Sequence, residues 1–191
     1  FNERLATPSL TANLRVALQC LMAAVAASRP PCKSALAVKL GVSGIVGIDS
    51  SMVSLWDGLA CFFKGTFMTA AAKLHLAIDL CTGEVSWFEL SEGSKHDSQH
   101  FPPTKMALLY IFDLGYWSFE LLNHLNDNSA FFLCRVKKGA SLTVQKVVYG
   151  IGNRIVGSRL SDYQIKRKSS DIVELEVSTS TEGGLRSYRA I

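Results

Sequence analysis

Several features that would assign these 191 residues to a familiar class are missing. The cysteines are odd in number, irregularly spaced and without a CxxC pair, which favours reduced thiols in a cytosolic protein over a disulfide framework. They are Cys20, Cys32, Cys61, Cys81 and Cys134. The sequence also lacks a Gly-rich phosphate loop, a GxSxG nucleophile elbow and a usable Cys–His–Asp arrangement. These absences remove the common signatures of nucleotide hydrolysis and of serine or cysteine nucleophiles.

No apolar run is long enough to cross a bilayer. The most apolar stretch, 14–27, carries Arg15 and falls short of the roughly 20 apolar residues that a spanning helix needs. A buried helix is the better interpretation, and we expect no membrane partner.

The composition is that of a folded protein. Hydrophobic residues make up 48% of the chain, which is enough to bury a core in one ordinary domain, or in one domain with part of another. The chain begins at Phe1 and stops at Ile191 without a terminal cap or tail, so we expect a fragment cut at both ends.

The net charge of +4 is unevenly distributed. Residues 135–168 contain nine Lys or Arg and a single acid, Asp162, so this segment is +8 and the remainder of the chain is −4. A basic segment on a mildly acidic body favours a polyanionic partner. The alternative is an ordinary solvated surface.

The hydrophobic pattern predicts an α/β fold. Helices are expected at 9–28, 33–40 and 118–127, the last with Ser118 as its cap. Continuous apolar strands are expected at 43–49, 107–113 and 130–137, an alternating hairpin at 73–91 with its turn at 81–83, and short strands with polar turns over 141–191. Residues 52–72 are mixed, and we interpret them as a helix or a loop.

Two of the apolar strands end in an acid, Asp49 and Asp113. Open α/β sheets place their sites at the carboxyl ends of strands. Two neighbouring carboxylates repel unless a cation joins them, and hard oxygen ligands suit Mg²⁺ or Mn²⁺. Two such ions about 3.5–4 Å apart support in-line phosphoryl transfer. For either acid alone, a turn or cap residue is the simpler interpretation.

A resemblance sharpens this hypothesis. The ordered set "IDSS", "AAAKLHLAIDLCTGEV", "LSEGSKHDSQHF", "IFDLGYWSFELL" and "FFLCRVK" resembles the catalytic domain of DDE transposases of the insertion-sequence-four family, over about residues 45–140 and more weakly to 190. The resemblance implies a ribonuclease-H-like mixed sheet flanked by helices, followed by the start of a β-rich insertion. It implies Mg²⁺- or Mn²⁺-dependent cleavage at transposon ends and strand transfer into target DNA, which is a DNA recombination reaction. On matching positions, Asp49 is the first catalytic, metal-binding acid and Asp113 is the second.

The resemblance also implies partners and a location. The partners are transposon-end DNA, target DNA and a second copy of the chain in a synaptic complex. The location is the bacterial cytoplasm, at the nucleoid.

The third acid of the family is a glutamate on a later helix within a Tyr…Arg…Glu…Lys pattern, and no such helix is visible here. Glu174, Glu176 and Glu182 lie in strand- or turn-like sequence and are poor substitutes. We therefore expect a helical lead-in at 1–43, the first part of the catalytic core at 44–140 and a truncated β-rich insertion at 141–191. An inactive transposase remnant with residual DNA binding, or a related metal-dependent nuclease, stays open as an alternative.

Several further residues are candidates for a functional role, and each also has a simpler structural interpretation. His96 and His100 are spaced for a helical metal site, but a surface or cap role is favoured. Asp97 matches the family pattern, with helix capping as its simplest role. Lys73 and His75 share a strand face with Asp79, which we expect to be solvated, and Tyr116 and Trp117 stack on bases or pack in the core. The candidate DNA-binding set is Lys73, His75, Tyr116, Trp117, Arg135, Lys137, Lys138, Lys166, Arg167 and Lys168.

Overall fold

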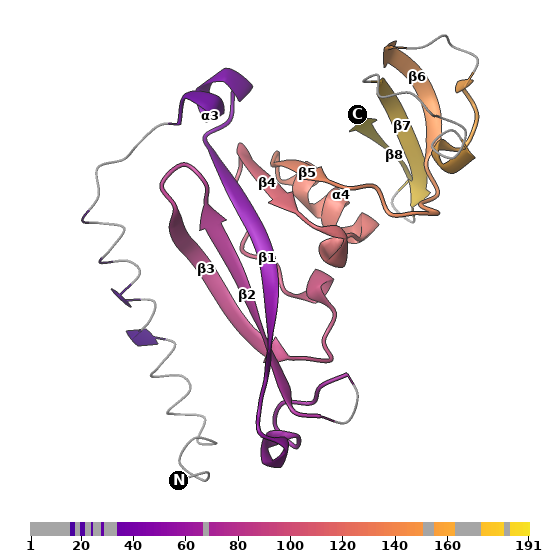
Figure 1. The fold of residues 1–191 in the computed structure, drawn as a ribbon. Helices are drawn as coiled ribbons and strands as arrows, with labels where there is room; N and C mark the ends of the chain where they lie inside the picture. Colours follow the sequence, from indigo (N-terminus) through magenta and orange to yellow (C-terminus); the bar gives the residue numbers. More distant parts are fainter. Residues whose placement is uncertain are drawn as a thin grey trace. The chain divides into compact units, whose positions relative to one another are not determined.

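The computed structural model in Figure 1 describes residues 34–66, 69–150, 155–162, 173–181 and 184–191, together with positions 16, 17, 20, 21, 24 and 28. It divides into two compact units, residues 1–134 and residues 135–191, which are treated separately below. The helix predicted for 9–28 lies outside the described residues apart from those isolated positions.

The first unit is built on a mixed five-stranded sheet. Its strand order is β3 (Glu84–Glu92), β2 (Ala71–Asp79), β1 (Gly44–Ser54), β4 (Leu108–Phe112) and β5 (Phe131–Cys134). The first three strands are antiparallel, while β1, β4 and β5 run parallel. The predicted α/β class is confirmed, and this order is consistent with a ribonuclease-H-like fold. Strand β1, which carries Asp49, and strand β4, which Asp113 follows, are neighbours at its centre.

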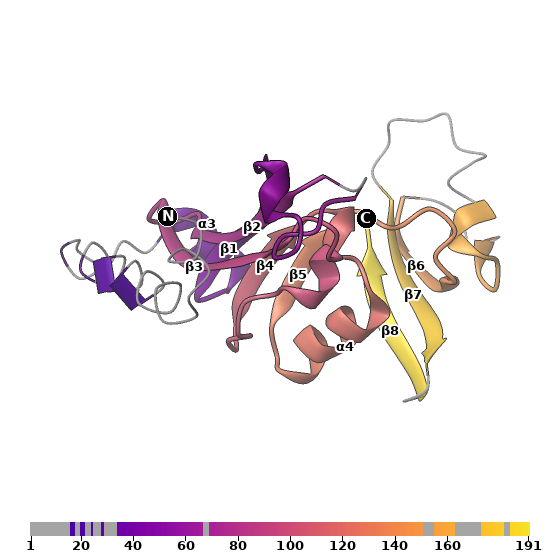
Figure 2. The same cartoon turned by 90° about the horizontal axis from the view of Figure 1, so that it is seen from below.

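Helix α4 (Phe119–Asp127) forms where it was predicted. The Ser118 hydroxyl accepts a hydrogen bond from the Leu121 backbone N–H at 3.1 Å, so the predicted cap is confirmed. Leu121, Leu122 and Leu125 are buried, and Figure 2 shows α4 lying against the β4–β5 part of the sheet. This apolar stripe fixes the helix that follows the Asp113 loop.

Helix α3 (Ala35–Leu40) also matches its prediction. Ser34 caps its first turn, and Gly41 ends it in the left-handed region at φ 69°, which glycine adopts without strain. The helix leads directly into β1. None of the helices that can be described is long and apolar enough to cross a membrane.

The two faces of β2 are occupied in the opposite way to our expectation. The predicted alternation is correct, but His75 and Ala77 are fully buried, whereas Leu74, Leu76 and Ile78 are half-buried. The segment 96–101 covers the His75 side, where the Phe101 ring packs against aromatic side chains of β4 and of the loop after it. The solvated face expected for Lys73, His75 and Asp79 is therefore wrong.

Two further expectations differ in detail. Strand β1 continues to Ser54, so it does not end at Asp49 as predicted, and the excursion expected over 52–72 begins later. Among the described residues between β1 and β2, the helical element is the 3₁₀ turn η1 (Asp57–Leu59). Strand β5, predicted as buried, lies at the sheet edge with Phe131 and Leu133 about half exposed.

The second unit is a three-stranded antiparallel sheet. Its strands are β6 (Thr143–Tyr149), β7 (Glu174–Thr181) and β8 (Gly184–Ala190), in that order. A small apolar core holds it, formed by Leu142, Val144, Leu160, Val173, Leu175 and Val177. The short strands predicted for 141–191 are confirmed for the described residues, and β7 and β8 pair as antiparallel neighbours.

Candidate functional site

Asp49 and Asp113 occupy equivalent positions on neighbouring parallel strands. The last paired residues of β1 and β4 in this ladder are Ile48 and Phe112, and each acid follows directly. Asp113 lies just beyond β4 and remains extended, with φ −86° and ψ 173°. Adjacent strands lie about 4.8 Å apart. In this register the two acids are therefore next to each other along the backbones of neighbouring chain segments.

Both acids are exposed to solvent. The Ser50 backbone N–H donates to the Asp49 carboxylate at 2.8 Å. Asp113 precedes the 3₁₀ turn η3 (Leu114–Tyr116), and its carbonyl accepts the Tyr116 N–H at 3.1 Å. Mg²⁺ is commonly held by one or two carboxylates with waters and phosphate oxygens completing its shell, so this donor pair fits such an ion. Within the described ranges, no group of three or more His, Cys, Asp or Glu side chains could hold a metal.

A buried polar network surrounds His75 of β2. His75 is wholly buried, with Nδ1 3.0 Å from the Tyr116 hydroxyl and Nε2 2.9 Å from the Ser91 hydroxyl. Ser91 in turn donates to the Glu92 carbonyl at 3.3 Å. This pattern suits a neutral imidazole that accepts from Tyr116 and donates to Ser91. Burial lowers the pKa of His75, and burial followed by the nearby Asp97 raises the pKa of Tyr116.

Asp97 does not cap the turn that contains it, contrary to the simplest prediction for it. The 3₁₀ turn η2 (Asp97–Gln99) is capped by His96, whose Nδ1 accepts from the Ser98 N–H. The Asp97 carboxylate instead accepts from the Ser50 hydroxyl at 3.2 Å and pairs with the Lys73 ammonium at 3.0 Å. Its contacts therefore reach 47 and 24 residues back along the chain.

The two histidines considered for metal binding have separate roles. His96 is an exposed cap, as favoured from the sequence. His100 stacks on His75, with ring centroids 4.5 Å apart, and its Nδ1 lies 3.3 Å from a Glu89 carboxylate oxygen. The sequence could not reveal this stack, because the two rings are 25 residues apart.

Several predicted DNA contacts need correction. His75, Tyr116 and Trp117 are 0, 1 and 8% exposed, so base stacking or phosphate contact by these side chains would require the core to open. Lys73 is only 12% exposed in its side chain and is tied to Asp97 and to the Lys95 carbonyl. Their alternation and aromatic character were consistent with a surface, but long-range packing buries them.

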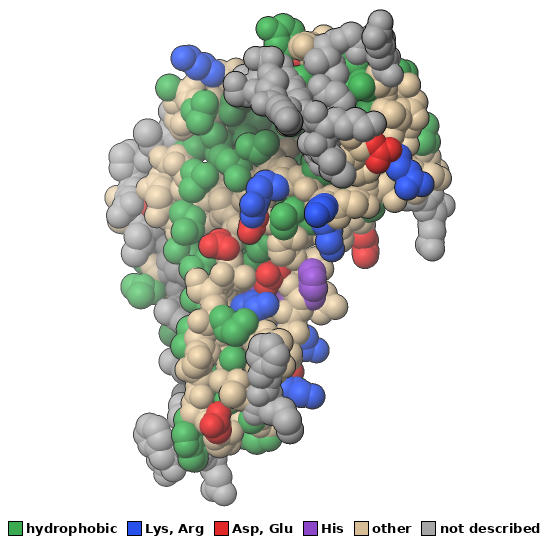
Figure 3. Space-filling model, turned by 45° about the vertical axis from the view of Figure 1, so that its right-hand side comes forward, with side chains coloured by type: hydrophobic (Ala, Val, Ile, Leu, Met, Phe, Trp, Pro, Cys, Tyr) green, Lys and Arg blue, Asp and Glu red, His purple; other side chains and the backbone are tan. Residues whose placement is uncertain are grey.

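The basic candidates at 135–168 are exposed where the structure describes them. Arg135, Lys137 and Lys138 are exposed at the start of the second unit, whereas Lys166, Arg167 and Lys168 lie outside the described residues. Basic and acidic side chains are interspersed on the face drawn in Figure 3. The described residues therefore retain three of the ten predicted contacts as accessible cations.

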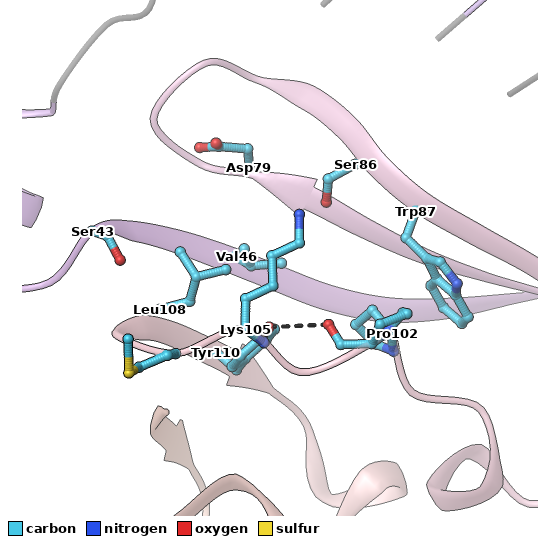
Figure 4. A pocket seen from close by; sticks show the side chains of 11 residues that line it. Ser43, Val46, Asp79, Ser86, Trp87, Pro102, Lys105, Leu108 and Tyr110 are labelled. Carbon is cyan, nitrogen blue, oxygen red and sulfur yellow. Dashed lines mark hydrogen bonds between the residues drawn. The ribbon is translucent and has the colours of Figure 1, made fainter. Parts of the chain in front are cut away.

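A cavity of about 400 Å³ lies in the first unit at the opposite end of β1 and β4 from the two acids. Ser43, Val46, Asp79, Trp87 and Lys105 are among the residues that line it. Figure 4 shows the Lys105 side chain extending across it toward the β2–β3 hairpin. Asp79 is already engaged by the Cys81 N–H at 2.7 Å. Neither Asp49 nor Asp113 lines this cavity.

Comparison with known proteins identifies the family of this chain. Residues 48–183 match the family model described as the transposase DDE domain. The chain is also similar to the transposase for insertion sequence element IS231B of Bacillus thuringiensis subsp. berliner, at 27% identity over 97 residues. That match covers 47% of this chain and 20% of the relative, so the chain spans about a fifth of the length of this relative. Because the family model covers well over half of the 191 residues, the chain belongs to the transposase DDE domain family.

Proposed function

We propose that this chain supplies the first two acids of a transposase active site, and that Asp49 and Asp113 together hold Mg²⁺ or Mn²⁺. The supporting observation is that each acid directly follows the last paired residues, Ile48 and Phe112, of the parallel β1–β4 ladder. Family membership supports an enzyme of the nuclease and transposase type acting on DNA. Cleavage at transposon ends and strand transfer into target DNA are the activities proposed for the whole protein.

Different local contacts position Asp49 and Asp113 for this role. The Ser50 N–H bond directs one oxygen of Asp49, which leaves the other for a cation. Asp113 is placed by the turn η3, whose Tyr116 is anchored in the core. A bound divalent ion would activate the attacking oxygen and stabilise the leaving oxygen of a phosphodiester. The protein contributes by fixing both carboxylates before substrate arrives.

Phosphate contact is proposed for the exposed cations at the start of the second unit. Arg135, Lys137 and Lys138 follow β5 closely in sequence, and the +8 charge of 135–168 favours binding to a DNA backbone. The same proposal extends to Lys166, Arg167 and Lys168, which lie outside the described residues. Such contacts give affinity without sequence specificity.

The two acids seen here are expected to bind metal weakly without a third. The candidates Glu174 and Glu176 lie on β7 of the second unit, where Glu174 pairs with Arg189, and Glu182 is outside the described residues. We propose that a further acid of the complete protein finishes the site. The alternative, a remnant that only binds DNA, predicts no metal site at Asp49.

Calorimetric titration of the 191-residue chain with Mn²⁺ tests the proposal. We expect weak binding that either Asp49→Asn or Asp113→Asn weakens at least about tenfold, with the double variant no weaker than the single variants. Asp57→Asn changes an exposed acid of η1 and is the matched control, which should bind Mn²⁺ like the unaltered chain. Binding that is insensitive to Asp49 and Asp113 would refute the proposal.

A further inference from the structure

We propose that Asp97 is a positioning residue for this site. It joins strand β1, which carries Asp49, to the turn that follows Asp113, and so sets how the two acids face a shared ion. This inference rests on the metal-binding role proposed for those two acids. It adds a third carboxylate with a different task, since Asp97 is not proposed as a ligand.

The first contact reaches β1. The Ser50 hydroxyl donates to Asp97 Oδ1 at 3.2 Å, while the Ser50 backbone N–H donates to Asp49 Oδ1 at 2.8 Å. One residue therefore connects the two carboxylates through two hydrogen bonds. Restraining the Ser50 side chain also restrains the peptide that directs Asp49.

The second contact reaches the turn η3. The other oxygen of Asp97, Oδ2, lies so close to Gly115 that a Cβ at this position would stand only 2.5 Å from it. Gly115 is two residues beyond Asp113, and η2 and η3 pack against each other. A side chain at position 115 would therefore displace either the Asp97 carboxylate or the turn, so each limits where the other can lie.

The third contact fixes the carboxylate itself. Lys73 Nζ lies 3.0 Å from Asp97 Oδ1 and also donates to the Lys95 carbonyl at 2.9 Å. The side chains of this ion pair are only 12 and 19% exposed, so water screens the pair less than a surface pair. The buried His75 side chain lies on the inner side of this carboxylate, with its Nδ1 3.9 Å from the same oxygen. Asp97 is thus held from β1, from β2 and from the facing turn.

A purely structural role predicts a different outcome from a positioning role. If Asp97 only stabilises the fold, disturbing it lowers the unfolding midpoint and leaves the Mn²⁺ affinity of the folded chain unchanged. If it orients the acids, Mn²⁺ affinity falls even where the chain remains folded. Outer partners of metal ligands typically change affinity about 10- to 100-fold.

Two variants disturb the bridge without changing any charge. Ser50→Ala removes the hydroxyl that binds Asp97 but keeps the backbone N–H on Asp49. Gly115→Ala places a methyl group against Asp97 Oδ2. In the Mn²⁺ titration each variant should weaken binding about tenfold. The titration is carried out at a temperature at which urea unfolding shows that the variant is folded. Asp97→Asn should weaken binding at least as much, since it also leaves the positive charge of Lys73 unbalanced.

The control is Asp79→Asn, which alters an acid on the same face of β2 but far from the bridge. Its carboxylate accepts a hydrogen bond from the Cys81 N–H, and the amide oxygen of asparagine can accept the same hydrogen bond. The Mn²⁺ affinity should therefore not change. The double variant S50A/G115A should bind no more weakly than the weaker single variant, because both act through Asp97. A loss equal to the product of the two single losses would overturn the shared route.

The remaining outcomes separate this inference from the proposed function. If Asp49→Asn weakens Mn²⁺ binding while Ser50→Ala and Gly115→Ala do not, the metal site stands and the positioning role of Asp97 is overturned. If Asp49→Asn has no effect, or the chain binds no Mn²⁺, both proposals are overturned. Should Gly115→Ala fail to fold, Ser50→Ala decides the question alone.

Discussion

Replacing Tyr116 by phenylalanine tests whether the buried network stabilises the first unit. The Tyr116 side chain is 1% exposed, and its hydroxyl is 3.0 Å from Nδ1 of the fully buried His75. Phenylalanine keeps the ring contacts with Phe101 and Phe112 but leaves this nitrogen without the hydroxyl. A buried group that loses its partner costs about 1–3 kcal/mol. With a urea dependence of about 2 kcal/mol per M, the unfolding midpoint should fall by roughly 0.5–1.5 M.

Tryptophan fluorescence is the suitable assay, because Trp56, Trp87 and Trp117 all belong to the first unit. Tyr149→Phe is the control: this tyrosine is 66% exposed, and its loss should move the midpoint by no more than the scatter between repeats. A Tyr116→Phe midpoint equal to that of the unaltered chain would show that His75 is satisfied without the hydroxyl. The hydrogen bond between Tyr116 and His75 would then not stabilise the first unit.

Three further predictions concern pH, DNA and activity. Burial lowers the pKa of His75 below its ordinary value of 6.5, with His100 and Lys73 adding to the effect and Asp97 and Glu89 opposing it. The unfolded chain therefore binds more protons below pH 6.5, and the urea midpoint should fall as pH drops from about 7 toward 5; His75→Gln should flatten this dependence, and an equal dependence in both chains would contradict the assignment. Replacing Lys137 and Lys138 by glutamine should reduce the slope of log affinity for DNA against log salt by about 1–2, measured by fluorescence anisotropy; the exposed Lys39→Gln is the control, and an unchanged slope would place the DNA elsewhere. The 191-residue chain with Mg²⁺ or Mn²⁺ should not nick supercoiled plasmid DNA, because two acids alone do not fix two ions; nicking that Asp49→Asn abolishes would mean that another acid of this chain, such as Glu174 or Glu176, completes the site.

Much of the framework was predictable because it depends on local pattern. Continuous apolar runs predicted the central strands β1 and β4, and the Ser118 cap with its leucine spacing predicted α4. The nearness of Asp49 and Asp113 along the backbone required only that β1 and β4 be parallel neighbours. The strand end expected at Asp49 is wrong, because β1 continues to Ser54 in its pairing with β2.

What the sequence could not predict depends on contacts between distant residues. Alternation along β2 indicated two faces but not which one the segment 96–101 would cover, so His75 was expected in solvent and is buried. Asp97 has the local pattern of a cap, and its actual partners, Ser50 and Lys73, come from two other strands. Burial of a polar strand face is stable here because its polar groups find partners in that covering segment and in the turn η3.

The central claim is that Asp49 and Asp113 hold one divalent ion between them. Iron-directed cleavage tests it most directly: Fe²⁺ bound in place of Mg²⁺, with ascorbate and peroxide, generates hydroxyl radicals that cut the nearest backbone. We predict cuts near residues 49 and 113 together, suppressed by excess Mn²⁺ and lost in both Asp49→Asn and Asp113→Asn. Cuts that persist in these variants, or that fall only near other residues, would contradict an ion shared by Asp49 and Asp113.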